Sequence, residues 1–549
     1  MKQLIHNGVL IPKYEHKKLH IFVKDKRIDL TPHQEEMAVA WVRKLDTDYA
    51  KDPVFVKNFF RDFRKALNIK EEDSPEDFDF STVLDYVSKE RETRLSLTRE
   101  ERKILAQERK RLREANKEKY GYATLDGTKV ETSNYLVEPS SIFMGRGKHP
   151  LRGRWKSGAS EEDVILNLSP DASIPEGKWK KIVWQPNSMW VAKWKDKLLK
   201  KTKYIWLSEA SSIRQRRDIE KYDVANEFGS KISEVRAHIW SHLRSEDSVV
   251  KKVATVSYLI DALSLRVGDE KDRDEANTVG ATTLRPNHIK IKRDGVVVFS
   301  FLGKDSVKWR KEIRLPEPVV SNLKELTAKS NSSVFNGIRS KDVNLFLGES
   351  MAGLTAKIFR THHASSTVKS YLMRTKVSKS DPSYYKKYVA TIANLQAAIV
   401  CNHKKKVSDK WPKALHRKQE AVRKSEDRLD KRKSRLKERK EKIEKLYAER
   451  KDAKPKRKKM ITERIKKEKQ QLQKDLERLP KEKQTVDEKK AKVALIRKTK
   501  GYNLNTSLKS YIDPRTYYEW GKDVEFDWKL YYPKTLQRKF SWLDDRSLT

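Results

Sequence analysis

Apolar residues recur at every seventh position in two stretches between Trp411 and Lys500, on either side of a Lys454-Pro455 break. Their positions are Leu415, Val422, Leu429, Leu436 and Ile443, then Ile465, Leu472, Leu479, Val486 and Val493. A seven-residue repeat places one narrow apolar stripe on a helix, and a second helix must cover that stripe. Residues 409–500 are therefore predicted to form an antiparallel coiled coil, whose first helix is roughly 60 Å long at 1.5 Å per residue.

The remaining positions of this apolar seam are largely Lys, Arg, Ser or Asp. We therefore expect the helix pair to be weakly stable, because few of its layers bury apolar side chains. Pro480 is expected to kink the second helix. A solvated, highly charged helix is the alternative interpretation, but strict repeats in both stretches argue against it.

The coiled coil interrupts two parts of the chain that can bury apolar surface. Residues 213–408 have the composition of a main globular core, and residues 501–549 are rich in aromatic residues. Residues 1–212 mix short strand patterns with capped helices. We therefore expect an α+β multidomain fold with domains over 1–212, 213–408, 409–500 and 501–549.

Two capping boxes mark helix starts in the first domain. Thr31 is followed by Pro32 and by Gln34, and Thr98 is followed three residues later by Glu101. Each pair can satisfy the free backbone N–H groups at a helix N-terminus. The second helix is highly charged, and Gly121 is expected to end it.

Two further patterns indicate the structure of residues 213–408. Residues 253–265 have the apolar character of a buried helix, and residues 289–315 have the pattern of a three-stranded meander. Asp294-Gly295 is a strong signal for the first turn of that meander. Lys304 falls in its second turn and is expected to project from a hairpin tip.

Charge points to a polyanionic partner. The 549 residues include 123 Lys and Arg against 78 Asp and Glu, which gives a formal net charge of +45 and a pI of about 9.9. Nucleic acid is the leading partner and an anionic membrane is the rival. No apolar run approaches the roughly 20 residues that span a bilayer, and the first residues lack an apolar signal core. A soluble intracellular protein that does not bind membranes is expected.

The single cysteine, Cys401, excludes an internal disulfide and a cysteine-based zinc site. His403 lies two residues away, but no further cysteine is available to make a metal site with it. We expect neither a metal nor a cofactor.

Aromatic and basic residues alternate between Trp179 and Trp206. The aromatic residues are Trp179, Trp184, Trp190, Trp194, Tyr204 and Trp206, and the lysines among them include Lys178, Lys180, Lys181, Lys193, Lys195, Lys200, Lys201 and Lys203. A basic strand surface that lies on DNA and a small β-rich core with lysines on its solvent side explain this pattern equally well. The two interpretations are compatible.

Five residues in the second half of the chain could act together on a phosphodiester: Arg266, Lys304, Arg360, His403 and Tyr511. Each is uninformative alone. A tyrosine before Ile-Asp-Pro-Arg is usually a surface or core residue, an arginine after an amphipathic helix is usually an ion-pair partner, and this chain has many lysines.

Taken together, these side chains provide a complete set of groups for strand cleavage. A phenol can attack phosphorus and keep the bond energy in a new phosphodiester, and nearby cations favour its phenolate form. Two arginines and an imidazole can stabilise the charge on the non-bridging oxygens in place of a metal ion. A lysine can protonate the leaving 5′ oxygen as a general acid.

The order of these residues and the motifs around them resemble type IB DNA topoisomerases of the eukaryotic kind. The resemblance covers nearly the whole chain and includes the segments 57–64, 143–150, 277–280, 302–306, 354–361, 401–403 and 506–515. It implies a DNA clamp in which 1–212 is a DNA-encircling cap and 213–408 is a mostly helical core of the tyrosine-recombinase type with a small antiparallel sheet. It also implies that 409–500 is a linker and that 501–549 is a small helical domain carrying the nucleophile.

The resemblance implies that Tyr511 forms a 3′-phosphotyrosine, that Lys304 is the general acid, and that Arg266, Arg360 and His403 stabilise the reacting phosphate. The positions implied to bind DNA are Arg146, His149, Lys203, Thr278, Asp305, Thr506 and Ser510. The expected activity is relaxation of positive and negative supercoils in duplex DNA by a monomer, without ATP or metal.

The chain departs from the family pattern at three places. Ser510 stands where nuclear members usually carry Asn at the camptothecin site, and Leu508 and Lys509 also differ from the usual pair. The long nuclear-targeted N-terminal domain is missing from the sequence, which resembles archaeal members and would also suit a viral or processed form. We expect a chromosome-associated protein, located at the nucleoid in an archaeal source or in the nucleus in a eukaryotic one.

Two alternatives remain open. A tyrosine recombinase uses nearly the same five residues, but it works as a tetramer on specific sites, and the coiled coil and the cap motifs favour a topoisomerase. A non-enzymatic chromosomal DNA-binding protein would need only the basic charge, and it would bind DNA in a salt-dependent way without forming a covalent adduct.

Overall fold

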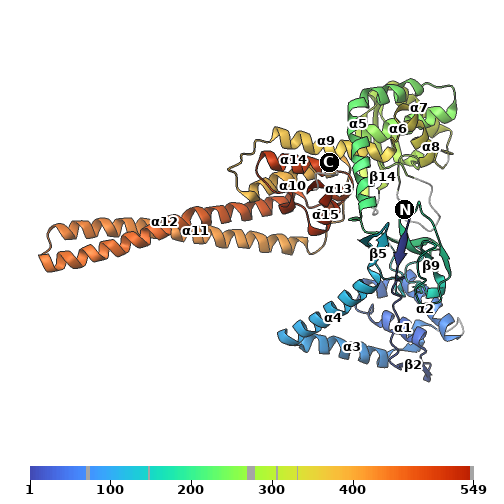
Figure 1. Cartoon of the computed structure of the whole chain (residues 1–549), viewed down its shortest axis with the longest axis horizontal. Coiled ribbons are helices and arrows are strands. Elements are labelled where there is room, and N and C mark those ends of the chain that lie inside the picture. Colours follow the sequence, from blue (N-terminus) through green and yellow to red (C-terminus); the bar gives the residue numbers. More distant parts are fainter. Residues whose placement is uncertain are drawn as a thin grey trace. The chain divides into compact units, whose positions relative to one another are not determined.

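The computed structural model describes residues 1–69, 74–145, 147, 149–268, 279–303, 307–330 and 332–544 (Figure 1). The described chain is mostly helical and carries several small, mainly antiparallel sheets. It divides into two compact units, the first formed by residues 1–220 and 538–542 and the second by most of the remainder. Among the described residues, no helix combines the length and apolar character needed to cross a membrane.

The first unit combines helices with short strands. Its helices are α1 (Pro32–Val42), α2 (Pro53–Leu67), α3 (Ser81–Ser96) and α4 (Arg99–Tyr120). Its strands are β1 (Leu4–His6), β2 (His20–Val23), β3 (Lys26–Asp29), β4 (Phe78–Asp79), β5 (Tyr122–Leu125), β6 (Thr128–Glu131), β7 (Ser141–Ile142), β8 (Trp155–Lys156), β9 (Val164–Asn167), β10 (Lys181–Val183), β11 (Trp190–Lys195) and β12 (Thr202–Trp206). The strand orders are β1-β5-β6, β3-β2-β4, β7-β8 and β10-β9-β11-β12.

An aromatic cluster organises the helical part of this unit. Phe55, Phe59 and Phe63 recur every four residues on α2, so they share one helix face. Trp41 of α1 stacks on Phe59 with ring centroids 4.6 Å apart. All four side chains are buried, so α1 and α2 are held together by aromatic packing.

Both predicted capping boxes are confirmed. The Thr31 hydroxyl accepts from the Gln34 backbone N–H, and the Gln34 side chain accepts from the Thr31 N–H. Thr98 and Glu101 form the same reciprocal pair at the start of α4. The α4 helix ends at Gly121, whose N–H donates to the carbonyl of Lys117, as the sequence predicts.

The basic and aromatic stretch forms strands β10 to β12. Trp190 and Trp194 are buried, which confirms that part of the pattern builds a β-rich core. Tyr204 and Trp206 on β12 are 40% and 37% exposed, and Lys195 is also exposed. The same sheet therefore has an aromatic core side and a surface with basic and aromatic side chains.

The second unit is built mainly from helices. Their bounds are α5 (Ser212–His242), α6 (Ser248–Leu263), α7 (Glu317–Ala328), α8 (Ser340–Ser350), α9 (Ala356–Arg374), α10 (Ser383–Val400), α11 (Trp411–Lys451), α12 (Pro455–Lys498), α13 (Leu504–Ser510), α14 (Arg515–Asp523) and α15 (Lys534–Lys539). Helices α5 and α15 each contain a boundary between the units. A large apolar core includes buried residues of α5 to α9 and of the sheet β13 (Ile289–Ile291), β14 (Val296–Gly303) and β15 (Val307–Arg314).

The predicted meander is confirmed by the strand order β13-β14-β15. Asp294 and Gly295 both have positive φ, 59° and 73°, which suits the left-handed turn expected of an Asp-Gly pair. The predicted second turn contains residues 304–306, which lie outside the described residues. The strand ends on either side are paired, Gly303 with Val307.

The buried helix before Arg266 is confirmed, but it ends earlier than predicted. The sequence placed its end at Leu265, whereas α6 ends at Leu263. Ser264 follows with a left-handed φ of 51°. A left-handed residue ends a helix by turning the chain away from its axis, so Arg266 lies past the turn.

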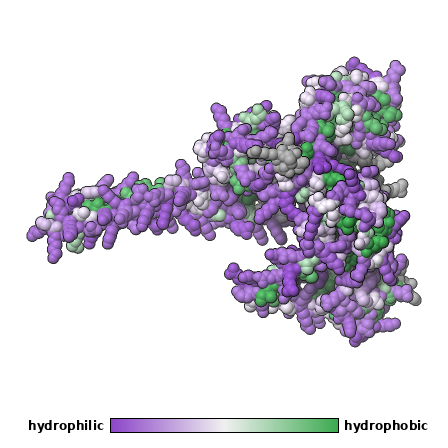
Figure 2. Space-filling view, in the orientation of Figure 1, coloured by the Kyte–Doolittle hydropathy of each residue, from purple (hydrophilic) through white to green (hydrophobic). Residues whose placement is uncertain are grey.

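Helices α11 and α12 run antiparallel, as the heptads predict, and both lie close to the predicted bounds (Figure 1). The stripe residues Leu429, Leu436, Ile443, Ile465 and Val486 are buried. Figure 2 shows that hydrophilic side chains cover most of the visible surface of this pair. Pro480 lies inside α12 without ending the helix.

Several polar positions of the seam are occupied by ion pairs. Arg432 on α11 lies 2.5 Å from Asp475 and 2.7 Å from Glu482 on α12. Arg439 lies 2.6 Å from Glu468 and 3.3 Å from Asp475. Apolar layers therefore alternate with charged layers, and the charged layers fix which residues of the two helices face each other.

Candidate active site

Tyr511 follows directly after α13, at a point where the ends of several helices in the second unit meet. Arg360 lies in the first turns of α9, His403 follows α10, and Arg266 follows α6. Arg266, Arg360 and His403 line one pocket together with Asn503 and Thr506. Residues spread over more than two hundred positions of the sequence are thus gathered at one place.

The end of α10 explains how His403 is presented. Asn402 has a left-handed φ of 51°, which lets the chain turn back on the helix. The His403 N–H donates to the carbonyl of Ala398, and the Asn402 N–H donates to that of Ile399. This hydrogen-bond pair is the Schellman arrangement of helix C-termini, and it places His403 immediately beyond the helix.

The guanidinium of Arg360 is the centre of the site. Its Nη1 donates to the Tyr511 hydroxyl oxygen over 2.8 Å, and its Nη2 donates to the Cys401 carbonyl over 2.8 Å. The same Nη2 lies 3.1 Å from His403 Nε2. Arg360 is only 3% exposed, so a full positive charge is held against the phenol away from bulk water.

The Arg360–His403 contact determines the proton position on the imidazole. A guanidinium can only donate hydrogen bonds, so His403 Nε2 must accept. A neutral ring that accepts at Nε2 carries its proton on Nδ1. His403 Nδ1 lies 2.7 Å from the Ser507 hydroxyl oxygen, which can accept that proton's hydrogen bond.

The pocket is strongly cationic. Burial lowers the pKa of the Arg360 guanidinium, the nearby Tyr511 and Cys401 oppose this, and the charge of Arg266 lowers the pKa further. Arginine nevertheless stays protonated at physiological pH. None of the described residues that line the pocket is acidic. Two guanidinium groups suit an anion such as a phosphate.

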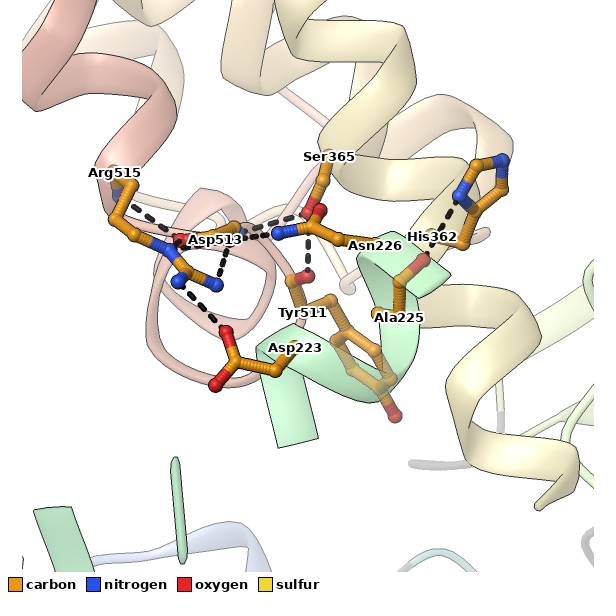
Figure 3. Close-up of polar contacts among 8 residues, drawn as sticks. All are labelled: Asp223, Ala225, Asn226, His362, Ser365, Tyr511, Asp513 and Arg515. Atoms are coloured by element: carbon orange, nitrogen blue, oxygen red, sulfur yellow. Dashed lines mark hydrogen bonds and ion pairs between the residues drawn. The ribbon is translucent and has the colours of Figure 1, made fainter. Parts of the chain in front are cut away.

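Contacts to the main chain also hold Tyr511 in place (Figure 3). Ser365 on α9 donates to the Tyr511 carbonyl over 3.3 Å and accepts from the Asp513 N–H over 2.9 Å. Arg515 bridges Asp513 and Asp223, with closest distances of 2.8 and 2.7 Å. Figure 3 shows the Tyr511 ring extending away from these contacts, so the backbone is anchored while the hydroxyl faces Arg360.

The structure brings Arg266, Arg360, His403 and Tyr511 together, with Thr506 in the same pocket and Ser510 directly before Tyr511. Lys304, Asp305, Thr278 and Arg146 lie outside the described residues. Gly303 and Val307, on either side of 304–306, line the pocket.

His149 and Lys203 belong to the first unit. His149 is buried, and its Nδ1 accepts from the Leu151 N–H. Lys203 lies 3.8 Å from the Glu138 carboxylate. Their contacts with DNA stay a prediction.

Sequence reasoning missed three groups that build the site: Ser507, Ser365 and the Cys401 carbonyl. Ser507 lies one helical turn before Tyr511, so helical spacing could have indicated it. The sequence offers no comparable signal for Ser365. Cys401 contributes its backbone to Arg360, and burial raises the pKa of its thiol, so the side chain is not poised to react.

Three family models match the chain. The DNA-binding fragment of eukaryotic DNA topoisomerase I matches residues 1–207, its catalytic core matches residues 210–443, and a C-terminal topoisomerase domain matches residues 482–547.

The chain is also similar to known DNA topoisomerases. It is 36% identical to DNA topoisomerase 1 beta of Arabidopsis thaliana over 74% of this chain and 45% of that protein. It is 32% identical to DNA topoisomerase 1 of Caenorhabditis elegans over 99% of this chain and 66% of that protein. It is 31% identical to the human mitochondrial DNA topoisomerase I over 78% of this chain and 73% of that protein. The chain spans about half the length of several relatives that it matches. It belongs to the eukaryotic DNA topoisomerase I family.

Proposed function

We propose that this chain is a type IB DNA topoisomerase that relaxes positive and negative supercoils through a transient single-strand break. The observation that carries the proposal is the buried contact between Arg360 and the Tyr511 hydroxyl, beside His403 and in a pocket that Arg266 also lines. A phenol, two guanidinium groups and an imidazole form a set that suits attack on a phosphodiester.

Tyr511 is the proposed nucleophile. The adjacent Arg360 guanidinium donates a hydrogen bond to its hydroxyl oxygen and so holds the phenol in place. The phenol oxygen attacks phosphorus, the bond from phosphorus to the 5′ oxygen breaks, and the 3′ end becomes bound to Tyr511. The 5′ oxygen leaves with a proton, for which Lys304 is the proposed donor. The reverse attack by the 5′ hydroxyl restores the strand.

The attacked phosphate gains negative charge on its non-bridging oxygens. Arg266 and Arg360 can each donate paired hydrogen bonds to such oxygens, and His403 can donate one more. These donors are held in place before the reaction, so little reorganisation is needed when the charge develops. The phosphotyrosine keeps the energy of the broken bond, so the cycle needs neither ATP nor a metal.

We propose that the partner is supercoiled duplex DNA, bound by a monomer. The net charge of +45 and the match of residues 1–207 to a DNA-binding fragment support this proposal. The proposed DNA contacts are Arg146, His149, Lys203, Thr278, Asp305, Thr506 and Ser510. In this proposal residues 1–212 form the cap, 213–408 the catalytic core, 409–500 a coiled-coil linker and 501–549 the C-terminal domain. The protein would act on chromosomal DNA.

The test is plasmid relaxation with EDTA and without ATP, on positively and negatively supercoiled substrates. The wild type should relax both, and Tyr511→Phe should bind DNA but relax neither. Tyr518→Phe is the matched control, because it removes a phenol oxygen from α14, a few residues beyond the site. Relaxation by Tyr511→Phe would refute the nucleophile. Binding without relaxation by the wild type would favour a site-specific recombinase or an architectural protein.

A further inference from the structure

We propose that Ser507 is a positioning residue that orients His403 and couples it to the nucleophile; this inference rests on the proposed function. Its hydroxyl oxygen lies 2.7 Å from His403 Nδ1, and the residue is fully buried. Orienting partners of a histidine determine which ring nitrogen carries the proton and where the other one points.

The contacts of His403 require a partner at Nδ1. Its Nε2 faces Arg360, which can only donate, so the neutral ring carries its proton at Nδ1. The ring is buried, with Arg360 at Nε2 and Ser507 at Nδ1, and its centroid lies 5.0 Å from that of the Tyr511 ring. Without the serine hydroxyl, that N–H would lose its hydrogen bond in a buried site, which is unfavourable.

A hydroxyl suits this position because the ring must change its role when DNA binds. A phosphate oxygen can only accept, so His403 Nε2 must then carry a proton. The ring can gain a second proton, in which case Ser507 continues to accept a hydrogen bond from Nδ1. It can also change to the tautomer protonated at Nε2, in which case Ser507 donates a hydrogen bond to Nδ1. A serine hydroxyl can do both.

Ser507 also supports the nucleophile through its backbone. Its carbonyl accepts from the N–H groups of Tyr511 and Ile512, each over 3.0 Å. The side chain of Ser507 therefore contacts the His403 imidazole, while its main chain holds the turn that carries Tyr511. A shift of α13 that moves Tyr511 would move the partner of His403 with it.

The experiment measures single-turnover cleavage of a DNA substrate whose 5′-hydroxyl fragment dissociates, so that the covalent adduct accumulates. Ser507→Ala should slow cleavage about tenfold to a hundredfold, by analogy with the loss of a hydrogen-bond partner that orients a metal-ligating histidine. DNA affinity should be unchanged. Ser507→Thr keeps the hydroxyl and should recover most of the rate.

The matched control is Ser257→Ala on α6. Ser257 is also fully buried, and its hydroxyl has no hydrogen-bond partner among the described residues. This variant makes the same chemical change and should cleave at the wild-type rate. Thermal unfolding of all variants reports any general loss of structure.

A double-mutant cycle with His403→Gln separates positioning from a merely structural role. Glutamine can place a donor near Nε2 but has no group at Nδ1, so Ser507→Ala should have almost no further effect on cleavage in that background. Two additive effects would overturn the proposal, as would wild-type cleavage by Ser507→Ala. If the wild type itself formed no adduct, the proposed function would fail instead.

Discussion

Replacing Arg360 with lysine tests whether the site needs a guanidinium or only a positive charge. In the structure Nη1 and Nη2 hold two different oxygens, those of Tyr511 and Cys401, each at 2.8 Å. A single ammonium nitrogen cannot occupy both positions. The substituted lysine therefore keeps the charge but loses at least one of these two charge-assisted hydrogen bonds.

The expected loss follows from the energy of that bond. A hydrogen bond to a charged group contributes about 1.5–3 kcal/mol. Each tenfold change in rate corresponds to about 1.4 kcal/mol. Arg360→Lys should thus lower the cleavage rate between about tenfold and about 150-fold.

The variant should also acquire a pH dependence. Burial lowers the pKa of the Arg360 guanidinium, and the same desolvation acts on a lysine, whose ordinary pKa is about 10.4. An amine is charged only below its pKa, so the variant should lose activity as the pH rises. This loss should begin at a lower pH in the variant than in the wild type.

The assay is single-turnover cleavage from about pH 6 to about pH 9, the range in which a buried lysine can titrate. Arg374→Lys is the control, since it makes the same change at an exposed position of α9. Wild-type rates for Arg360→Lys over the whole range would refute the role of the paired donors.

Three further outcomes are expected. Ser365→Ala removes the hydrogen bonds to the main chain around Tyr511. The free energy of unfolding measured with denaturant should fall by about 1 kcal/mol, and cleavage should slow. An unchanged free energy of unfolding together with an unchanged cleavage rate would contradict the anchoring role. Asp475→Ala leaves Arg432 with one partner fewer in the α11–α12 seam, so the melting temperature followed by circular dichroism should fall, and an unchanged melting curve would show that the ion pair contributes nothing. Burial raises the pKa of Asp261, but hydrogen bonds from His363 and Arg236 outweigh it and hold that pKa below its ordinary value. The stabilisation by Asp261 is therefore complete above about pH 4, the unfolded pKa, and is lost as the pH falls through the lower folded value. In Asp261→Asn the free energy of unfolding should therefore decrease less steeply as the pH is lowered below about 4. An equally steep decrease would show that the Asp261 carboxylate does not contribute to the acid sensitivity.

Local patterns in the sequence were sufficient for much of the secondary structure. The heptads specified α11 and α12, the Thr31 and Thr98 boxes specified helix starts, and Asp294-Gly295 specified a turn. Each of these signals acts through residues within one or two helical turns, where backbone geometry and side-chain spacing decide the outcome. The predicted end of the helix before Arg266 was wrong by two residues, because nothing in the residue types marks the left-handed conformation of Ser264.

The order of Arg266, Arg360, His403 and Tyr511 in the sequence indicated the site, and resemblance to a family supplied their roles. Their mutual geometry depends on tertiary structure. The Arg360–Tyr511 contact joins residues 151 positions apart, and the His403–Ser507 contact joins residues 104 positions apart. A single contact between residues far apart in the chain produces no repeating pattern of residue types in the sequence. Neither the proton position on His403 nor the anchoring by Ser365 could therefore be deduced from the sequence alone. The packing of α9 and α13 against α10 brings these donors and acceptors within hydrogen-bonding distance. Burial then favours the paired arrangement, because each unpaired buried polar group is costly.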